Sequence, residues 1–117
     1  MSLVRKIPTK AKRSSRWRSQ SHLAHVRKHA CCVCDSEVNI EAAHLRLGTD
    51  GSMAAKPSDY FVTPLCGGPD GCHARQHKGE RSFWQASGKD PLEIIEELIR
   101  TSPRRREILE ARNAQKF

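Results

Sequence analysis

The spacing of apolar residues along the chain predicts several short amphipathic helices. Leu23 and Val26 lie three residues apart behind Ser21, which favours a first helix with Ser21 as its N-cap. Residues 72–85 fit a second helix that continues through Gly79 and carries aromatic side chains toward the core.

The clearest helix start is Asp90-Pro91-Leu92-Glu93, which supplies an N-cap, a proline at the first helical position and a glutamate at the third. The helix that follows is expected to pack through one apolar face, formed by Leu92, Ile95, Leu98 and Ile99, while its glutamates face elsewhere. Ser102-Pro103 repeats the start signal and predicts a last helix over residues 104–113, which buries at most Ile108 and Leu109.

Two strands are expected between these helices. Val38, Ile40 and Ala42 alternate with more polar neighbours, which predicts a strand that ends at His44. Residues 60–62 form a second short apolar run before Pro64, and glycine-rich loops follow at 48–52 and 67–71. Strands and helices in this order predict a small α+β domain.

Composition adds that the core of this domain is thin. The chain has 117 residues, of which 37% are hydrophobic, so a metal or disulfide staple is expected to supplement the core. No apolar run approaches the length of a membrane span, and the N-terminus lacks the apolar segment of a signal peptide. We therefore expect a cytoplasmic protein without a membrane partner.

Positive charge is concentrated at the start of the chain. The formal net charge is +8, and residues 1–34 contain nine Lys or Arg and no acidic residue. Residues 1–20 are interpreted as a basic arm that follows a DNA phosphate backbone, although many such arms are only solvated and flexible. Within it, Trp17 fits base stacking and a core anchor equally well.

The cysteines favour a zinc site over disulfides, because there are five of them and two are adjacent. Cys31 and Cys34 have the C-x-x-C spacing of a zinc knuckle, and Cys66 and Cys72 supply two more thiolates. The gap between the second pair is wider than usual, which makes that half of the signal weaker. Cys32 is interpreted as a small buried apolar residue.

Three histidines suggest hydrolytic chemistry. His73 and His77 are four residues apart, so on a helix both imidazoles face one side and can bind one divalent ion. His44 ends the first strand, and a neutral imidazole there suits a general base that activates water. His22, His25 and His29 are interpreted as ordinary surface residues.

These motifs occur in an order that resembles the HNH (His-Me finger) nucleases, within them the small phage and prophage nucleases related to recombination proteins. The resemblance covers residues 21–100 and rests on an ordered set of segments: Cys31-x-x-Cys34, Glu41-Ala-Ala-His44-Leu-Arg46, Lys56-Pro-Ser-Asp59, Thr63-Pro-Leu-Cys66, Cys72-His73-Ala-Arg-Gln-His77 and Gly79-Glu80-x-x-Phe83-Trp84. It implies a zinc-stabilised ββα-metal core, preceded by the arm and followed by a basic helix in residues 101–117.

The resemblance also implies roles for single residues. His44 corresponds to the general base, Asp59 to the central Asn that braces the loop, and His73 and His77 to the ligands of a catalytic Mg²⁺ or Mn²⁺ ion. DNA is the implied substrate, and recombination proteins are implied partners. Candidate phosphate contacts, from their nearness to the motif, are Arg46, Lys56 and Arg75.

One alternative function stays open at this point. Many relatives carry a metal ligand directly before the base, whereas this chain has Ala43, and Glu41 is a weaker candidate further back on the strand. Together with Asp59 in place of Asn, this favours a second hypothesis, a zinc-stabilised nucleic-acid-binding accessory protein that does not cut. A zinc knuckle serving a protein partner is a third.

Overall fold

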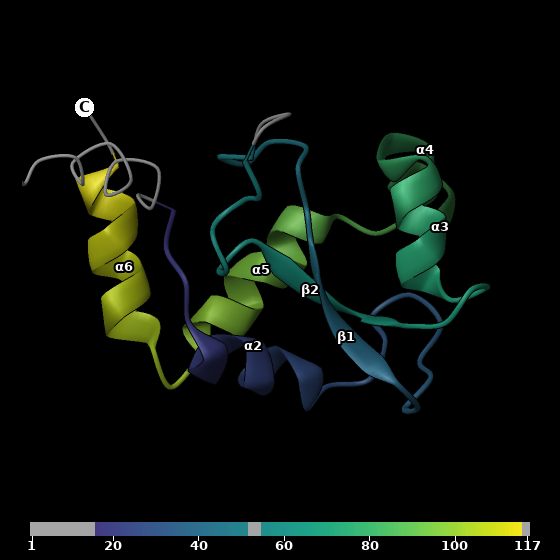
Figure 1. The fold of residues 1–117 in the computed structure, drawn as a ribbon, viewed down its shortest axis with the longest axis horizontal. Coiled ribbons are helices and arrows are strands. Elements are labelled where there is room, and N and C mark those ends of the chain that lie inside the picture. The colour runs from purple at the N-terminus through teal and green to yellow at the C-terminus, as the bar shows by residue number, and fades with distance from the viewer. Residues whose placement is uncertain (1–15, 52–54, 116–117) are drawn as a thin grey trace, which may run out of the picture.

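The chain forms a small α+β fold built around one β-hairpin. A computed structural model describes residues 16–51 and 55–115, and the predicted fold class is confirmed at the level of one two-stranded sheet and five helices within them. The strands cross the middle of the molecule, α3 and α4 lie at one end and α6 at the other (Figure 1). In chain order the elements are α2 (Gln20–Arg27), β1 (Ile40–His44), β2 (Val62–Cys66), α3 (Cys72–Lys78), α4 (Glu80–Ser87), α5 (Pro91–Arg100) and α6 (Arg105–Ala114).

The first predicted strand ends at His44, as expected, but the second prediction was wrong in its position. β2 begins at Val62 and continues through Pro64 to Cys66, and it pairs antiparallel with β1 from Ile40↔Cys66 to His44↔Val62. Proline is tolerated because both strands of a two-stranded sheet are edge strands. The Pro64 carbonyl accepts a hydrogen bond from the Cys32 N–H at 2.9 Å, which ties the cysteine knuckle to the strand.

Two helix boundaries also differ from the prediction. The N-cap of α2 is Ser19 rather than Ser21, because the Ser19 hydroxyl accepts the His22 N–H at 3.1 Å. The helix expected over residues 72–85 is divided at Gly79, whose extended backbone (φ −175°, ψ 91°) ends α3 and caps α4. Because of this break, residues 72–87 form two separate helices rather than one.

The predicted start of α5 is confirmed, since the Asp90 carboxylate accepts the Leu92 N–H at 3.0 Å. Its apolar face is shorter than expected. Ile95, Leu98 and Ile99 are buried, whereas Leu92 keeps 38% of its surface exposed in the first turn. The glutamates of α5 are exposed, as predicted.

The last helix starts one residue later than predicted, at Arg105, after a turn in which the Ser102 hydroxyl accepts the Arg104 N–H at 3.0 Å. Of its two apolar candidates, Ile108 is fully buried and Leu109 is 40% exposed. Ile108 therefore anchors this helix in the core, and the Arg112 guanidinium adds two hydrogen bonds to the Glu96 carboxylate of α5, at 3.0 and 2.9 Å.

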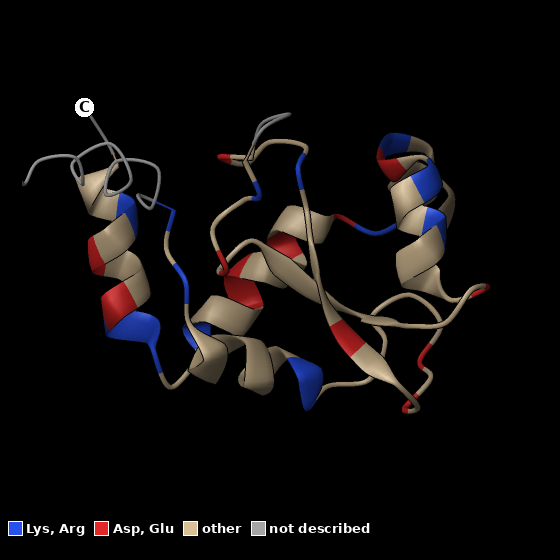
Figure 2. Ribbon diagram, viewed as in Figure 1, with Lys and Arg blue, Asp and Glu red and all other residues tan. Residues whose placement is uncertain are grey.

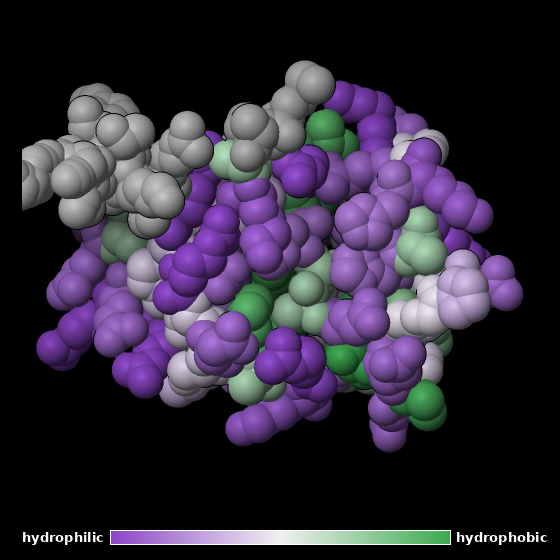
Figure 3. Space-filling model, in the orientation of Figure 1, coloured by the Kyte–Doolittle hydropathy of each residue, from purple (hydrophilic) through white to green (hydrophobic). Residues whose placement is uncertain are grey.

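The core lies between the hairpin and the helices that pack on it. α2 contacts both strands, α5 and α3 contact β2, and α6 contacts α5. The face seen in Figure 3 is largely hydrophilic with scattered apolar residues, so the apolar side chains lie mostly inside. The main cluster of buried residues is Cys31, Ala43, Leu45, Tyr60, Leu65, Cys72, Trp84, Ile95, Ile99 and Ile108.

Candidate functional site

Four cysteines meet at the end of the hairpin where Ile40 pairs with Cys66. The sulfur atoms of Cys31, Cys34, Cys66 and Cys72 all lie within 4.8 Å of one another. Four thiolates at this separation form the donor set of a tetrahedral structural zinc site. The cluster can therefore hold a metal such as zinc, with the ligands that the spacing predicted.

The wide gap between Cys66 and Cys72 closes because the loop between them folds back tightly. A side chain on Gly71 would collide with the backbone carbonyl oxygens of Cys66 and Gly67, so only glycine fits this turn. The Cys72 N–H then donates to the Cys66 sulfur at 3.3 Å. The loop therefore places the fourth sulfur beside the other three.

The backbone around the knuckle stabilises one thiolate in particular. Burial by itself would raise the pKa of Cys31, but hydrogen bonds from the backbone of Cys34, Val33 and Cys66 lower it to about 7. Cys32 lies outside the cluster and is half-buried, and burial raises the pKa of its thiol to about 11. A thiol that stays protonated fits the predicted apolar role of Cys32.

At the other end of the hairpin, His44 is held by Asp59. His44 Nε2 lies 2.9 Å from Asp59 Oδ1, and both side chains are largely withdrawn from solvent. The pair joins the end of β1 to the loop before β2. The structure thus brings together two of the residues predicted for the catalytic site.

Asp59 is in turn fixed from the N-terminal side. Its Oδ2 accepts the Ser19 N–H at 2.8 Å, and the Arg18 guanidinium lies 3.2 Å from Oδ1. Burial by itself would raise the pKa of Asp59, but the hydrogen bonds from His44 and the Ser19 N–H hold it below its ordinary value. Asp59 is therefore an anchored carboxylate that orients the imidazole.

The backbone of His44 is also held by a relay that the sequence did not indicate. The Gln76 amide donates to the His44 carbonyl oxygen at 3.2 Å and accepts the Trp84 indole N–H at 2.8 Å. Both side chains of the relay are buried. This chain of hydrogen bonds connects α3 and α4 to the end of β1.

A small cavity of about 160 Å³ opens beside His44, and its other lining residues are Arg46, Gln76, His77 and Glu80. The Glu80 carboxylate accepts the N–H groups of Arg46 (3.0 Å) and Leu47 (2.7 Å), so it fixes the chain that leaves β1. The sequence gives Glu80 no role beyond its place in a motif, since its partners lie more than thirty residues away. The cavity therefore combines two imidazoles, a cation and a fixed carboxylate.

The two helical histidines lie side by side, as predicted. The rings of His73 and His77 stack with centroids 4.8 Å apart and an interplanar angle of 26°. His77 lines the cavity beside His44, whereas His73 Nδ1 lies 2.6 Å from Glu41 Oε1. Gly67 makes room for that carboxylate, since a Cβ there would collide with it. Glu41 thus orients one imidazole and leaves its other nitrogen available for a ligand.

The imidazoles of His73 and His77 form at most a partial donor set for a metal ion, because they offer two ligand atoms. Across residues 16–51 and 55–115, the cysteine cluster is the only set of three or more His, Cys, Asp or Glu residues that converges on one point. Ala43 is fully buried in the core, so the strand supplies no ligand from that position.

The candidate phosphate contacts all lie on the surface. Arg46, Lys56 and Arg75 are exposed, and Arg46 lines the cavity while its guanidinium donates to the Ala55 carbonyl at 3.3 Å. Figure 2 shows basic positions gathered on α3 and α4 and acidic positions along α5. The helices beside His44 thus present the charge that attracts phosphate.

Trp17 and His22, near the start of the described chain, both pack into the interior. Trp17 packs against the core with its ring centroid 5.6 Å from that of Tyr60, which supports the core-anchor interpretation. His22 was predicted on the surface, and that prediction was wrong, because His22 is fully buried and bonds through Nδ1 to the Ser102 hydroxyl at 2.8 Å. Most of the basic arm, residues 1–15, lies outside the described residues.

Comparison with known proteins gives one family. A family described as "Protein of unknown function (DUF968)" matches residues 7–103, which is most of the chain. No curated protein and no solved structure matches the chain. Among the described helices, none has the length and apolar character needed to cross a membrane.

Proposed function

The chain belongs to the DUF968 family, and we propose that it is a metal-dependent HNH-type endonuclease that hydrolyses phosphodiester bonds in DNA. The observation that carries the proposal is the contact of His44 with the buried, anchored Asp59 at the edge of a cavity that His77 also lines. A histidine oriented by a carboxylate is an arrangement that enzymes use for proton abstraction.

Asp59 determines which nitrogen of His44 acts as the base. A carboxylate at 2.9 Å favours a proton on Nε2, so Nδ1 keeps its lone pair. His44 Nδ1 would then take the proton from a water molecule that attacks phosphorus, and the resulting imidazolium is stabilised by the anionic Asp59. The Gln76–Trp84 relay keeps the backbone of His44 in place during this transfer.

The remaining groups hold the substrate. His77 and His73 would bind a Mg²⁺ or Mn²⁺ ion, which withdraws charge from the phosphate and the leaving oxygen when bound. The guanidinium of Arg46 lies at the same cavity and can pair with a phosphate oxygen, while Arg75 and Lys56 supply weaker, exposed positive charge. Zinc on the four cysteines completes the proposed ββα-metal domain as a structural ion.

The biological setting is proposed from the motif resemblance. The resemblance points to phage or prophage recombination or DNA processing in the cytoplasm of a bacterial or phage-infected cell, with recombination proteins as partners. The basic N-terminal sequence adds general affinity for DNA without base recognition.

A second candidate function is supported by one observation. The ion proposed at His73 and His77 has no third protein ligand converging on it in the described part of the chain, and Ala43 is buried. A zinc-stabilised DNA-binding accessory protein that does not cut would have the same charge and the same cysteine cluster. The two functions differ in whether added metal produces cleavage.

The test is cleavage of supercoiled plasmid and of single-stranded DNA by zinc-loaded protein, with and without added Mg²⁺ or Mn²⁺. We expect metal-dependent cutting that falls at least about a hundredfold in His44→Ala, because the general base is lost. His29→Ala is the matched control, since His29 is exposed and distant from the cavity residues.

Zinc content is measured on every sample, so that loss of the structural ion is not mistaken for loss of the base. Salt-sensitive DNA binding without cutting under any metal would overturn the nuclease and establish the accessory binder. Equal cutting by wild type and His44→Ala would overturn the role of His44.

A further inference from the structure

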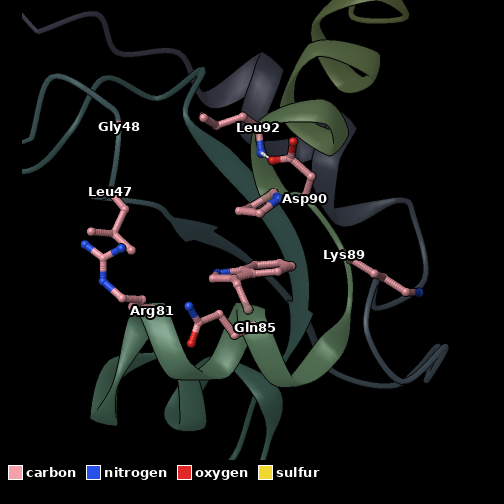
Figure 4. A pocket seen from close by; sticks show the side chains of 9 residues that line it. Leu47, Gly48, Arg81, Gln85, Lys89, Asp90 and Leu92 are labelled. Atoms are coloured by element: carbon pink, nitrogen blue, oxygen red, sulfur yellow. Dashed lines mark hydrogen bonds between the residues drawn. The ribbon is translucent and has the colours of Figure 1, made fainter.

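A second and larger cavity lies on the other side of α4, between that helix and the start of α5 (Figure 4). Its volume is about 500 Å³, several times that of the cavity at His44. Nothing in the proposed hydrolysis uses it. Its main lining residues are Leu47, Arg81, Trp84, Gln85, Lys89 and Leu92.

The walls of this cavity are apolar and exposed. Leu47 and Leu92 each leave 38% of their surface accessible, and they are two of the four large apolar residues exposed in the described chain. Pro91 and the indole of Trp84 complete the apolar lining. Aliphatic and aromatic side chains at a cavity of this size are suited to a flat apolar ligand.

The edge of the cavity is polar. Gln85 is exposed there, and its amide can both donate to and accept from a ligand. Arg81 is also exposed and forms no ion pair with any described carboxylate. The Lys89 ammonium points away from the cavity (Figure 4) and donates to the Cys32 carbonyl oxygen at 2.7 Å, and the one acidic residue at the edge, Asp90, caps α5. Arg81 therefore supplies the unpaired charge at the edge, which favours a flat ligand that also carries negative charge.

Hydrogen bonds connect this cavity to the His44 site. The Glu80 carboxylate, which lines the small cavity, accepts the N–H of Leu47, which lines the large one. Trp84 contributes to the large cavity and, through Gln76, reaches the His44 carbonyl. Because Glu80 lines the small cavity and the next residue, Arg81, lines the large one, the two cavities are neighbours along the start of α4.

We propose that the cavity between α4 and α5 binds one unpaired nucleobase of a DNA strand, next to the phosphate held at His44. The base lies between Leu47 and Leu92, its edge faces the Gln85 amide, and an adjoining phosphate lies near Arg81. This inference rests on the proposed action on DNA. A base inside an intact duplex cannot enter, so single-stranded or locally opened DNA is the favoured substrate.

The experiment compares two strands with equal phosphate charge. Fluorescence anisotropy measures the affinity of zinc-loaded protein for a short labelled oligothymidylate and for an abasic strand of the same length, without added Mg²⁺ or Mn²⁺. We expect wild type to bind the strand with bases about tenfold more tightly, because one apolar-packed base adds roughly this factor. The abasic strand reports phosphate attraction alone.

Leu92→Asp is expected to abolish this tenfold preference, since it places a carboxylate in the apolar wall. Leu109→Asp is the matched control, with the same change of charge at a leucine of similar exposure on α6. Because both variants change the net charge equally, the ratio of the two affinities isolates the cavity. Circular dichroism and zinc content confirm that both variants are folded.

Two results overturn the inference. The first is equal affinity of wild type for both strands, which is the result expected if the cavity instead binds an apolar side chain of a protein partner. The second is a preference for the strand with bases that survives Leu92→Asp. Metal-dependent cutting without any base preference rejects this subsite and leaves the nuclease standing. A base preference without cutting rejects the nuclease and leaves the subsite.

Discussion

The two ends of the β-hairpin are built in different ways. Where Ile40 pairs with Cys66, four sulfur atoms already lie within 4.8 Å of one another, and two of the four cysteines are buried. Where His44 pairs with Val62, the side chains form separate pairs, His44 with Asp59 and His73 with Glu41, beside a small cavity. Closed four-ligand sites are typical of structural metals and open sites of catalytic ones. This difference is what we expect if a metal at one end stabilises the fold and the other end is the proposed active site.

The largest effect is expected from breaking the closed end. Cys34→Ser removes one ligand from an exposed position, so the loss of packing is small and the effect reports on the metal. Because a structural zinc site in a small domain contributes on the order of 10 kcal/mol, we expect the variant to lose zinc and its cooperative thermal unfolding. Circular dichroism and zinc content measure both.

The control for this change is Cys32→Ser, at a cysteine outside the cluster. It should keep its zinc and lose at most about 1 to 2 kcal/mol of unfolding free energy from the half-buried position. If Cys34→Ser retains zinc and melts like wild type, the cluster is not a structural metal site, and the contrast between the two ends fails.

The open end is expected to lose activity before it loses structure. Asp59→Ala removes the carboxylate that orients His44 and stabilises its protonated form, so cleavage should fall by on the order of a hundredfold or more. The loss of hydrogen bonds to the Ser19 N–H and Arg18 should cost about 1 to 3 kcal/mol of unfolding free energy. Plasmid cleavage and urea denaturation measure the two effects separately.

Asp50→Ala is the matched control for Asp59→Ala. Asp50 accepts three hydrogen bonds, from the N–H and the hydroxyl of Ser58 and from the Gln115 amide, and it does not contact His44. A similar loss of stability with unchanged cleavage is expected. If both variants cut equally well, Asp59 is a structural carboxylate only.

A smaller effect at the open end is expected from Glu41→Gln. Glu41 lies against His73 Nδ1 at 2.6 Å, and a carboxylate behind a ligating histidine raises its basicity. Calorimetric titration of Mn²⁺ into zinc-loaded protein should show affinity about tenfold lower than in wild type. Glu37→Gln, at an exposed residue before the same strand, should leave it unchanged. If Glu41→Gln binds Mn²⁺ as tightly as wild type, the contact between Glu41 and His73 does not contribute to the proposed metal site.

The sequence predicted those features that local chemistry determines. The cysteine pairs and the start of α5 at Asp90 follow from residue type and spacing, and the structure places them as expected. The contact of Asp59 with His44 follows only from the family resemblance, which makes Asp59 a bracing residue. The position of β2 was missed because Pro64 argues against a strand, and an edge strand tolerates it.

Features that depend on distant contacts were not predictable. The Gln76 relay and the Glu80 carboxylate connect residues more than thirty positions apart, and nothing local indicates their partners. Leu92 matched the helical pattern but faces a cavity rather than the core. Burial of His22 depends on Ser102, which is eighty residues further along the chain.

That buried histidine gives the smallest predicted effect and sharpens the contrast with His44. His22 is fully buried, and its Nε2 has no hydrogen-bond partner among the described residues. Burial, assisted by the neighbouring His25, lowers the pKa of His22 from 6.5 to about 4. The unfolded chain therefore binds a proton between these values and the folded chain does not. Stability contributed by the neutral imidazole is full above about pH 6.5 and is lost as the pH falls toward 4.

Urea denaturation near pH 7.5 and near pH 5.5 measures this loss, which should be about 1 kcal/mol for the His22 group. The thiolates of the cysteine cluster also take up protons in acid, so the readout is the difference in pH dependence between wild type and His22→Gln. We expect the smaller dependence in His22→Gln, because glutamine does not titrate, and an unchanged dependence in the exposed control His29→Gln. Equal slopes in wild type and His22→Gln would mean that His22 is protonated in the folded protein in spite of its burial.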